Sequence, residues 1–252
     1  HPLYPLSGKG HVDNMVLKEQ PTSFSDKNHL QIFLISMFSK GENVSPSYSS
    51  ENVQPTLKIP FTIMDGEISN YSIPDIRVGG FGPLFSGVFV ISMIATIYIV
   101  VRLIKSKNWN LLIPYLLILA IIAVLILALD GNYWARYIPY FYAVPILSLA
   151  YLLWDKNKKL EFIIGIIITI IMFTNTCIVL YVNVKKAKAS DQYIGNRLNE
   201  FLEYYRSTDN VEIKLNHSGV QGALYTLDDL GAKNYTIKDE IENEREGYFF
   251  TY

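Results

Sequence analysis

The sequence lacks paired cysteines, a strong net charge and the common motifs of soluble enzymes. Its single cysteine, Cys177, excludes an internal disulfide and a cysteine-based zinc site. A formal net charge of −1 provides no excess of positive charge, so a dedicated nucleic-acid binder is excluded. Neither a phosphate-binding loop of the Walker type nor an HExxH zinc motif is present. The sequence therefore identifies no cofactor and no metal ligands.

Charge is also missing from four long stretches. Half of all residues are apolar and 18% are charged, against about 25% in an average soluble protein. The uncharged stretches are Leu84–Val101, Leu111–Leu129, Tyr137–Trp154 and Phe162–Val184. A helix needs about 20 mostly apolar residues to cross a hydrocarbon core of about 30 Å. We therefore predict an α-helical integral membrane protein with four transmembrane helices, at about 84–104, 110–129, 136–154 and 161–184.

The distribution of lysine and arginine predicts the orientation of these spans, because cytoplasmic loops carry an excess of both residues. Six cations lie in the first and third joints between spans: Arg102, Lys105, Lys107, Lys156, Lys158 and Lys159. Five lie near the spans on the other side: Arg77, Arg136, Lys185, Lys186 and Lys188. The count favours a multi-pass protein of the cytoplasmic (inner) membrane whose residues 1–80 and 185–252 are extracytoplasmic.

The region before the first span, residues 1–80, is predicted to be an extracytoplasmic loop region with little regular structure. Apolar residues at helical spacing predict a short amphipathic helix from Asp26 to Lys40, capped by Asp26. Alternating apolar residues in Leu57–Ile63, interrupted by a proline, favour an edge strand or an extended segment. The glycines of the run Gly79-Gly80-Phe81-Gly82 are expected to let the chain turn tightly into the first span.

The region after the last span, residues 190–252, is predicted to form a small α/β extramembrane unit. Helical periodicity marks Tyr193–Tyr205 and Val220–Leu230. The segments Val211–Leu215 and Tyr235–Ile237 are predicted strands. Helices that alternate with short strands are typical of a small sheet covered on one face.

Arg136 is the most informative candidate for a binding residue. It opens the third predicted span, in the sequence Gly131-Asn132-Tyr133-Trp134-Ala135-Arg136-Tyr137. A planar guanidinium grips two phosphate oxygens at once, and at headgroup depth it is placed to pair with a lipid-linked phosphate. The alternative is an ordinary anchor whose charged end reaches the membrane surface. Arg77, ahead of the first span, either reaches the interface in the same way or pairs with Asp75.

Three runs of sequence, taken together, resemble a known family. They are His1-Pro2-Leu3-Tyr4-Pro5-Leu6, the stretch from Asp75 to Leu84, and Ala135-Arg136-Tyr137 followed by Pro139. With these runs, the chain resembles the C-terminal half of a bacterial polytopic membrane glycosyltransferase of the GT-C superfamily. The resemblance covers about residues 1–184 and is weaker over residues 185–252.

The resemblance implies an enzyme that moves a sugar from a polyprenyl-phosphate carrier to a glycan, lipid or protein acceptor outside the cytoplasmic membrane. The implied partners are membrane lipids, the polyprenyl-phosphate-linked sugar and the acceptor, with no nucleic acid. The residue carried over is Arg136, as a ligand of the carrier phosphate, with Arg77, Tyr137 and Asn132 as further substrate-binding candidates. The family's catalytic carboxylate lies on the first outward loop, which we expect in a missing N-terminal half of a longer protein. No catalytic residue is therefore assigned.

Two alternatives from other classes are a non-catalytic transporter or flippase of lipid-linked glycans and a membrane-anchored interaction protein. Transporters place ionisable residues inside their spans. The first three uncharged stretches have none, and the polar residues of the fourth include Asn175 and three threonines. This pattern argues against ion-coupled transport. For an interaction protein, residues 190–252 would be the binding module.

Overall fold

The structure is a computed structural model in which the chain divides into two compact units, His1–Asn183 and Val184–Tyr252. It describes residues 20–44, 54–73, 76–128, 130–154, 157–207, 211–215, 227, 229, 231–232, 235–238 and 250–251. These residues are mostly helical. The sequence run at residues 1–6, Asp75 and most of the predicted helix Val220–Leu230 lie outside the described residues.

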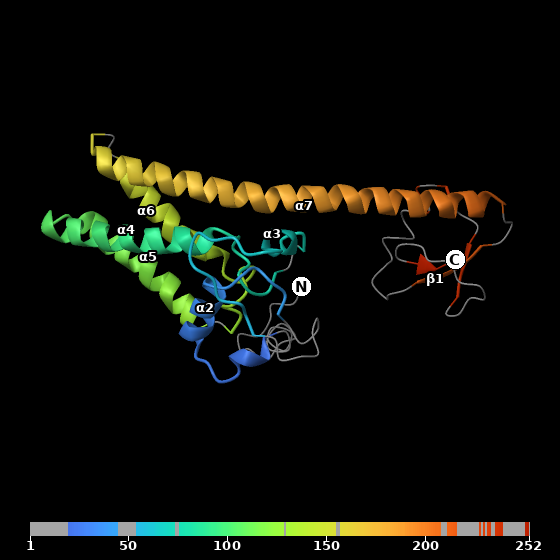
Figure 1. Cartoon of the computed structure of the whole chain (residues 1–252), viewed down its shortest axis with the longest axis horizontal. Helices are drawn as coiled ribbons and strands as arrows, with labels where there is room; N and C mark the ends of the chain where they lie inside the picture. The colour runs from blue at the N-terminus through green and yellow to red at the C-terminus, as the bar shows by residue number, and fades with distance from the viewer. Residues whose placement is uncertain are drawn as a thin grey trace. The chain divides into compact units, whose positions relative to one another are not determined.

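Helices make up most of the first unit, and Figure 1 shows α4, α5 and α6 gathered beside the first part of α7. The helices are η1 (Thr22–Phe24), α2 (His29–Met37), α3 (Glu67–Asn70), α4 (Phe85–Lys105), α5 (Trp109–Ala128), η2 (Pro139–Tyr142), α6 (Ala143–Trp154) and α7 (Lys159–Ser207). Among the described residues, α4, α5 and α7 are long and apolar enough to cross a membrane. The bounds of α4 and α5 agree with the predicted spans to within one residue.

The third predicted span is shorter than expected. Only η2, with 4 residues, and α6, with 12, are helical there. At about 2.0 Å per residue in η2 and 1.5 Å in α6, they rise about 26 Å, which is short of a hydrocarbon core of about 30 Å. The helical segment starts at Pro139, which has no N–H for a preceding helical turn. Residues 131–137 form turns instead.

The fourth predicted span and the predicted helix Tyr193–Tyr205 are one continuous helix. The 49 residues of α7 rise about 73 Å at 1.5 Å per residue, more than twice the thickness of a hydrocarbon core. Between Val184 and Tyr193 the chain has no glycine or proline, and its lysines and alanines are good helix formers. Nothing in this stretch ends the helix, so the predicted break is wrong.

The region before α4 differs from its predictions in two places. The cap of α2 is Asn28, not Asp26: the Asn28 side chain accepts a hydrogen bond from the Gln31 N–H, and the Gln31 side chain accepts one from the Asn28 N–H. The predicted edge strand at Leu57–Ile63 is not formed. Leu57 makes one isolated bridge to Ser39, and Phe61, with φ of 68°, leaves the extended region.

The glycine run before α4 forms the predicted tight turn. Gly79 and Gly82 have φ of 67° and 111°, a region that only glycine adopts readily. A Cβ on Gly79 would lie 2.8 Å from the carbonyl oxygen of Ser39, and a Cβ on Gly82 would lie 2.4 Å from the amide of Asn175. Both glycines are therefore required by backbone conformation and by space.

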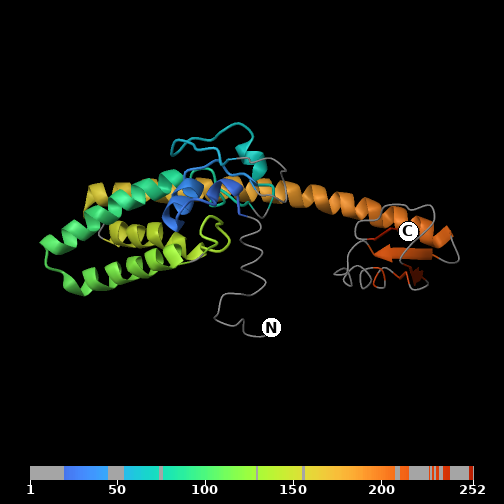
Figure 2. The same cartoon turned by 90° about the horizontal axis from the view of Figure 1, so that it is seen from below.

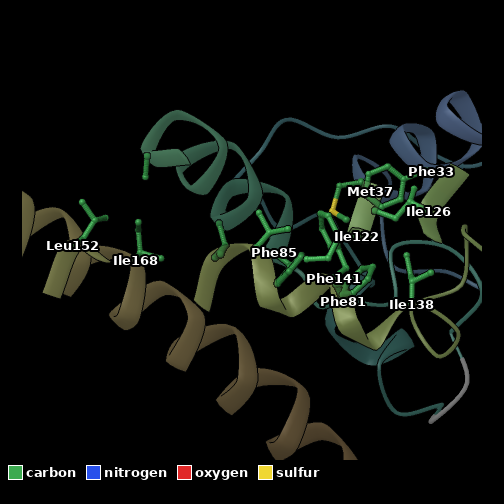
Figure 3. Packing of buried hydrophobic residues seen from close by; sticks show 13 residues of the cluster. Phe33, Met37, Phe81, Phe85, Ile122, Ile126, Ile138, Phe141, Leu152 and Ile168 are labelled. Atoms are coloured by element: carbon green, nitrogen blue, oxygen red, sulfur yellow. The ribbon is translucent and has the colours of Figure 1, made fainter. Parts of the chain in front are cut away.

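An aromatic core joins this turn to the helices, and Figure 3 shows it from close by. Phe81 of the turn stacks on Phe85 of α4, with ring centroids 4.8 Å apart. Phe141 of η2 meets the Phe81 ring edge to face at 5.6 Å. Met37 of α2 and Ile122 of α5 belong to the same cluster. The residues just before α6 are therefore held in place by packing in this aromatic cluster.

Polar contacts tie α4 to α7 at two places, and these contacts show that the two helices run antiparallel. Near the end of α4, Arg102 pairs with Glu161 in the first turn of α7. Ahead of α4, the Asn175 side chain accepts a hydrogen bond from the Leu84 N–H at 2.9 Å. It also donates one to the Phe81 carbonyl at 3.0 Å. The Asn175 amide thus satisfies backbone groups that the start of a helix leaves unpaired.

Buried hydroxyl groups link α4, α5 and α6. The Thr96 hydroxyl lies 3.2 Å from the Tyr115 hydroxyl and 3.1 Å from that of Ser148. Such hydrogen bonds hold helices together in a membrane, where no hydrophobic effect drives them to associate.

In the second unit, the end of α7 covers a small sheet. The strands β1 (Val211–Leu215), β2 (Tyr235–Ile237) and β3 (Phe250–Thr251) lie in the order β2-β1-β3. β1 pairs parallel with β2 and antiparallel with β3. Phe201 of α7 packs with Val211 and Ile213 in the core. β1 and β2 have the predicted bounds, and Figure 2 shows the sheet from a second direction.

Candidate functional site

A pocket of about 210 Å³ lies in the first unit, beside the loop that connects α5 to η2. That loop contributes Trp134, Ala135 and Arg136, and α7 contributes Val179 and Asn183. The remaining lining comes from residues 71–80, ahead of α4: Tyr71, Ile73, Ile76 and Gly80. Three segments that are far apart in the sequence therefore form the pocket.

Hydrogen bonds fix the walls of the pocket. The Asn183 side chain donates to the Tyr71 carbonyl at 3.0 Å, which ties α7 to the segment after α3. The Tyr71 hydroxyl donates to the Gly79 carbonyl at 2.7 Å. Burial raises the pKa of the Tyr71 phenol, so the hydroxyl keeps its proton and remains a donor. Gly80 lies against Ala135, since a Cβ on Gly80 would come within 3.1 Å of the Ala135 side chain.

Trp134 is the fully buried centre of the loop that carries Arg136. The Arg77 guanidinium lies over the Trp134 ring, 3.8 Å from its centroid, a cation–π contact. The Tyr137 ring meets the Trp134 ring edge on, with ring centroids 5.0 Å apart and an interplanar angle of 83°. The indole Nε1–H has no acceptor in the described part of the chain. A buried donor without an acceptor costs free energy, and the packing around Trp134 has to offset this cost.

Arg136 brings a positive charge to the rim of the pocket. It is exposed, and its guanidinium lies 6.0 Å from the centroid of the Tyr137 ring. Among the residues that line the pocket, Arg136 is the one with a charged side chain. The pocket therefore combines a cation at its rim, the buried Trp134 and the apolar side chains of Ile73, Ile76 and Val179.

The other three predicted substrate-binding residues support the loop and do not line the pocket. Arg77 is 5% exposed and lies against Trp134. Asn132 is 1% exposed, and its side chain donates to the carbonyls of His29 at 2.7 Å and Ile126 at 2.9 Å. Tyr137 packs on Trp134. The structure thus separates one residue at the rim from three that position the loop.

Sequence reasoning missed the pocket roles of Trp134, Tyr71 and Asn183. The position of Trp134 just before a predicted span indicates only an aromatic residue at a membrane interface. The available signal for Asn183 was its position, one amide in an apolar run just before the lysines at 185 and 186. Tyr71 gave no signal, because its contacts to Gly79 and Asn183 depend on the fold.

A buried ion pair braces the segment ahead of α4. Lys58 pairs with Glu67, and their side chains are 2% and 0% exposed. Lys58 Nζ also donates to the Pro83 carbonyl at 2.6 Å, and Glu67 accepts from the N–H groups of Gly41 and Met64 at 3.1 and 3.0 Å. Burial lowers the pKa of the Lys58 amine, and the Glu67 carboxylate partly opposes this shift. With every contact directed inward, the pair has a structural role.

Within the described ranges, no three histidine, cysteine, aspartate or glutamate side chains converge, and we assign no metal site there. Comparisons with known protein families, curated proteins and solved structures gave no match.

Proposed function

We propose that the chain is part of a membrane glycosyltransferase that transfers a sugar from a polyprenyl-phosphate carrier to a glycan, lipid or protein acceptor. The transfer takes place outside the cytoplasmic membrane, in which the protein is multi-pass. The observation that carries the proposal is the pocket of about 210 Å³ with the exposed Arg136 at its rim. The resemblance of the sequence to the GT-C superfamily supports the same reading.

The size of the pocket suits one group of the donor and not the whole molecule. Pockets for small-molecule ligands measure roughly 300–1,000 Å³, and this pocket is smaller. We assign it to the carrier phosphate and the adjoining atoms. The polyprenyl chain then remains in the bilayer and the sugar extends away from the membrane.

Charge neutralisation is the chemistry that Arg136 would contribute. When the bond between sugar and phosphate breaks, the bonding electrons remain on the phosphate oxygen, and negative charge develops there. A guanidinium stabilises this charge with two parallel hydrogen bonds. Trp134 lines the same pocket and is fully buried beside Arg136. The base that activates the acceptor is not assigned to any residue of this chain.

The polar groups in the helices favour an enzyme over an ion-coupled transporter. Asn175 is 3% exposed and is engaged by backbone groups of Phe81 and Leu84. Thr96 and Ser148 bond to each other and to neighbouring helices. These groups hold the fold together, so they do not form a path for an ion.

The test replaces Arg136 and measures binding of a polyprenyl phosphate to the full-length protein in detergent. Arg136→Ala should weaken binding about ten- to a hundred-fold, which corresponds to the loss of a charge-assisted hydrogen bond. Arg136→Lys should recover only part of the affinity, because an ammonium cannot form the two-pronged contact. Transfer of sugar from the polyprenyl-phosphate donor should fall in the same order.

Arg197→Ala is the matched control, because Arg197 is also beside a tyrosine, with its guanidinium 5.4 Å from the Tyr193 ring. This variant should bind and transfer as the parent does. Unchanged affinity and transfer in Arg136→Ala would show that Arg136 is only a membrane anchor, and the proposal would fail.

A further inference from the structure

A second and larger cavity lies at the other end of the transmembrane helices. It is a groove of about 680 Å³ between α4 and α7, with Leu152 of α6 among its lining residues. Along α7, it begins near Leu160, whereas the pocket with Arg136 is lined by Val179. At 1.5 Å per residue, these positions are about 29 Å apart, close to the thickness of a hydrocarbon core. The groove and the pocket are therefore separate sites.

The groove is apolar over most of its length. Ile91 and Ile94 of α4 face Ile164 and Ile167 of α7 across it. On α7, the lining extends from Lys159 to Ile167, about 12 Å at 1.5 Å per residue. One leaflet of a bilayer has a hydrocarbon depth of about 15 Å. The groove thus covers most of the hydrocarbon depth of one leaflet.

One end of the groove is positively charged. Lys158 and Lys159 both line it there. The acidic side chain in the lining, Glu161, pairs with Arg102 and accepts a hydrogen bond from the Tyr98 hydroxyl at 2.8 Å. Its charge is therefore compensated by Arg102, and Lys158 and Lys159 bring two ammonium groups to this end of the groove. The arrangement is a basic site between membrane helices, continuous with an apolar channel.

We propose that the groove binds an anionic phospholipid of the leaflet at this end of the helices. An acyl chain lies between α4 and α7, and the headgroup phosphate lies at Lys158 and Lys159. Anionic headgroups bind in basic pockets between membrane helices. A helix from another protein fits less well, because helix interfaces in membranes favour small side chains and this groove is lined by isoleucine and leucine.

The test uses the full chain in lipid nanodiscs and a phospholipid with a photoreactive group on its acyl chain. Phosphatidylglycerol and phosphatidylcholine with identical chains are compared, and the labelled peptides are mapped. Phosphatidylglycerol should label the groove segments of α4 and α7 more strongly than phosphatidylcholine does. The double variant Lys158→Gln/Lys159→Gln should remove this preference, on the order of a 30-fold loss for two lysines near an anionic surface.

Two matched controls separate a site from general surface effects. Lys105→Gln/Lys107→Gln removes two cations at the same end of α4 that do not line the groove, and it should leave the preference intact. Ile94→Trp fills the groove and should reduce labelling by both lipids. Ile97→Trp should not, although Ile97 is as exposed as Ile94, at 62% each.

Three outcomes would overturn the proposal. Equal labelling by the two lipids would mean an ordinary lipid contact. An equal loss of the preference for phosphatidylglycerol in both double-lysine variants would mean that the lipid responds to the general surface charge. Displacement of the label by a second copy of the chain, or preferentially by polyprenyl phosphate, would assign the groove to that partner. None of these outcomes involves Arg136 or sugar transfer, so the test is independent of the proposed function.

Discussion

Two segments of the chain have similar alternating sequences, and they bury opposite halves of the pattern. In Val211–Leu215 the apolar Val211 and Ile213 are 1% and 0% exposed, and the intervening Glu212 and Lys214 are half-buried. In Leu57–Ile63 the apolar Ile59 is 72% exposed, and the Lys58 side chain is 2% exposed. One segment has its apolar side chains inside, and the other has its charge inside.

The partners of each segment explain the difference. β1 has a strand on either side, and Phe201 of α7 packs on its apolar face. Within the part of the chain that the structure describes, Leu57–Ile63 has no strand partner beyond the single bridge at Leu57. The pair of Lys58 with Glu67 holds the segment in place. Alternation specifies two faces, but the surrounding elements decide which face is buried.

The exposed apolar side chains of Leu57–Ile63 lie beside α4, which is long and apolar enough to cross a membrane. Phe61 lies on Gly87 of α4, since a Cβ on Gly87 would fall within 2.2 Å of the Phe61 ring. Further along α4, Ile94 and Ile97 are each 62% exposed. An outward apolar face is what a lipid environment favours, because hydrocarbon replaces water as the solvent. The apolar face of Leu57–Ile63 is thus suited to an apolar medium, whereas the apolar face of β1 is buried in a small core.

The largest effect is expected at the buried ion pair. Lys58→Met or Glu67→Gln alone should lower the free energy of unfolding by about 3–5 kcal/mol, because each leaves the other group buried without its partner. The double variant Lys58→Met/Glu67→Gln should be more stable than either single variant. Chemical denaturation in detergent gives the three values. Additive losses would show that the two side chains do not act as a pair.

The next effect concerns the apolar residues of the two segments. Ile213→Ala should cost about 2–5 kcal/mol, since it opens a cavity in a filled core. Ile59→Ala in detergent should stay within about 0.5 kcal/mol, since this side chain is already exposed. Denaturant midpoints of the two variants measure the difference. Comparable losses would mean that Ile59 is also packed against the protein.

The smallest effect concerns pH. Burial lowers the pKa of Lys58, so in the window between that lowered value and 10.5 the unfolded chain binds more protons than the folded chain. Stability then rises with pH through this window. The melting temperature of the parent should therefore rise between neutral pH and pH near 10, when it is compared at each pH with that of Lys58→Met/Glu67→Gln. This double variant lacks both titrating groups. A relative loss for the parent would mean that the ion pair outweighs burial at Lys58.

Composition predicts the parts of this fold that depend on local sequence. The ends of α4 and α5 were predicted to within one residue because charge disappears over each span. β1 and β2 were predicted because their apolar residues alternate. The shortness of the third span was not predictable in this way, since no charge interrupts the stretch Tyr137–Trp154. The helical segment begins instead at Pro139, which has no N–H for a preceding helical turn.

The candidate site also combines features that local sequence predicts with features that depend on long-range contacts. Arg136 was recognisable from the sequence because a lone cation before an apolar stretch is a local signal. The burial of Trp134 was not, because it depends on Arg77, which is distant in the sequence. In the same way, Asn132 looked like a binding residue, and the structure engages its amide nitrogen with His29 and Ile126. Local sequence reveals what charge a site carries, and long-range contacts decide which residues support it.

The contact of Asn175 with the start of α4 has a consequence for biosynthesis. Asn175 lies 91 residues after Leu84, whose N–H it accepts. At 5–20 residues per second, a ribosome needs roughly 5–18 s to cover that distance. During this interval, the Leu84 N–H and the Phe81 carbonyl need another partner, and water can supply it only at the membrane surface. Because this contact lies ahead of α4 and not midway along it, every turn of α4 can form before Asn175 has been made.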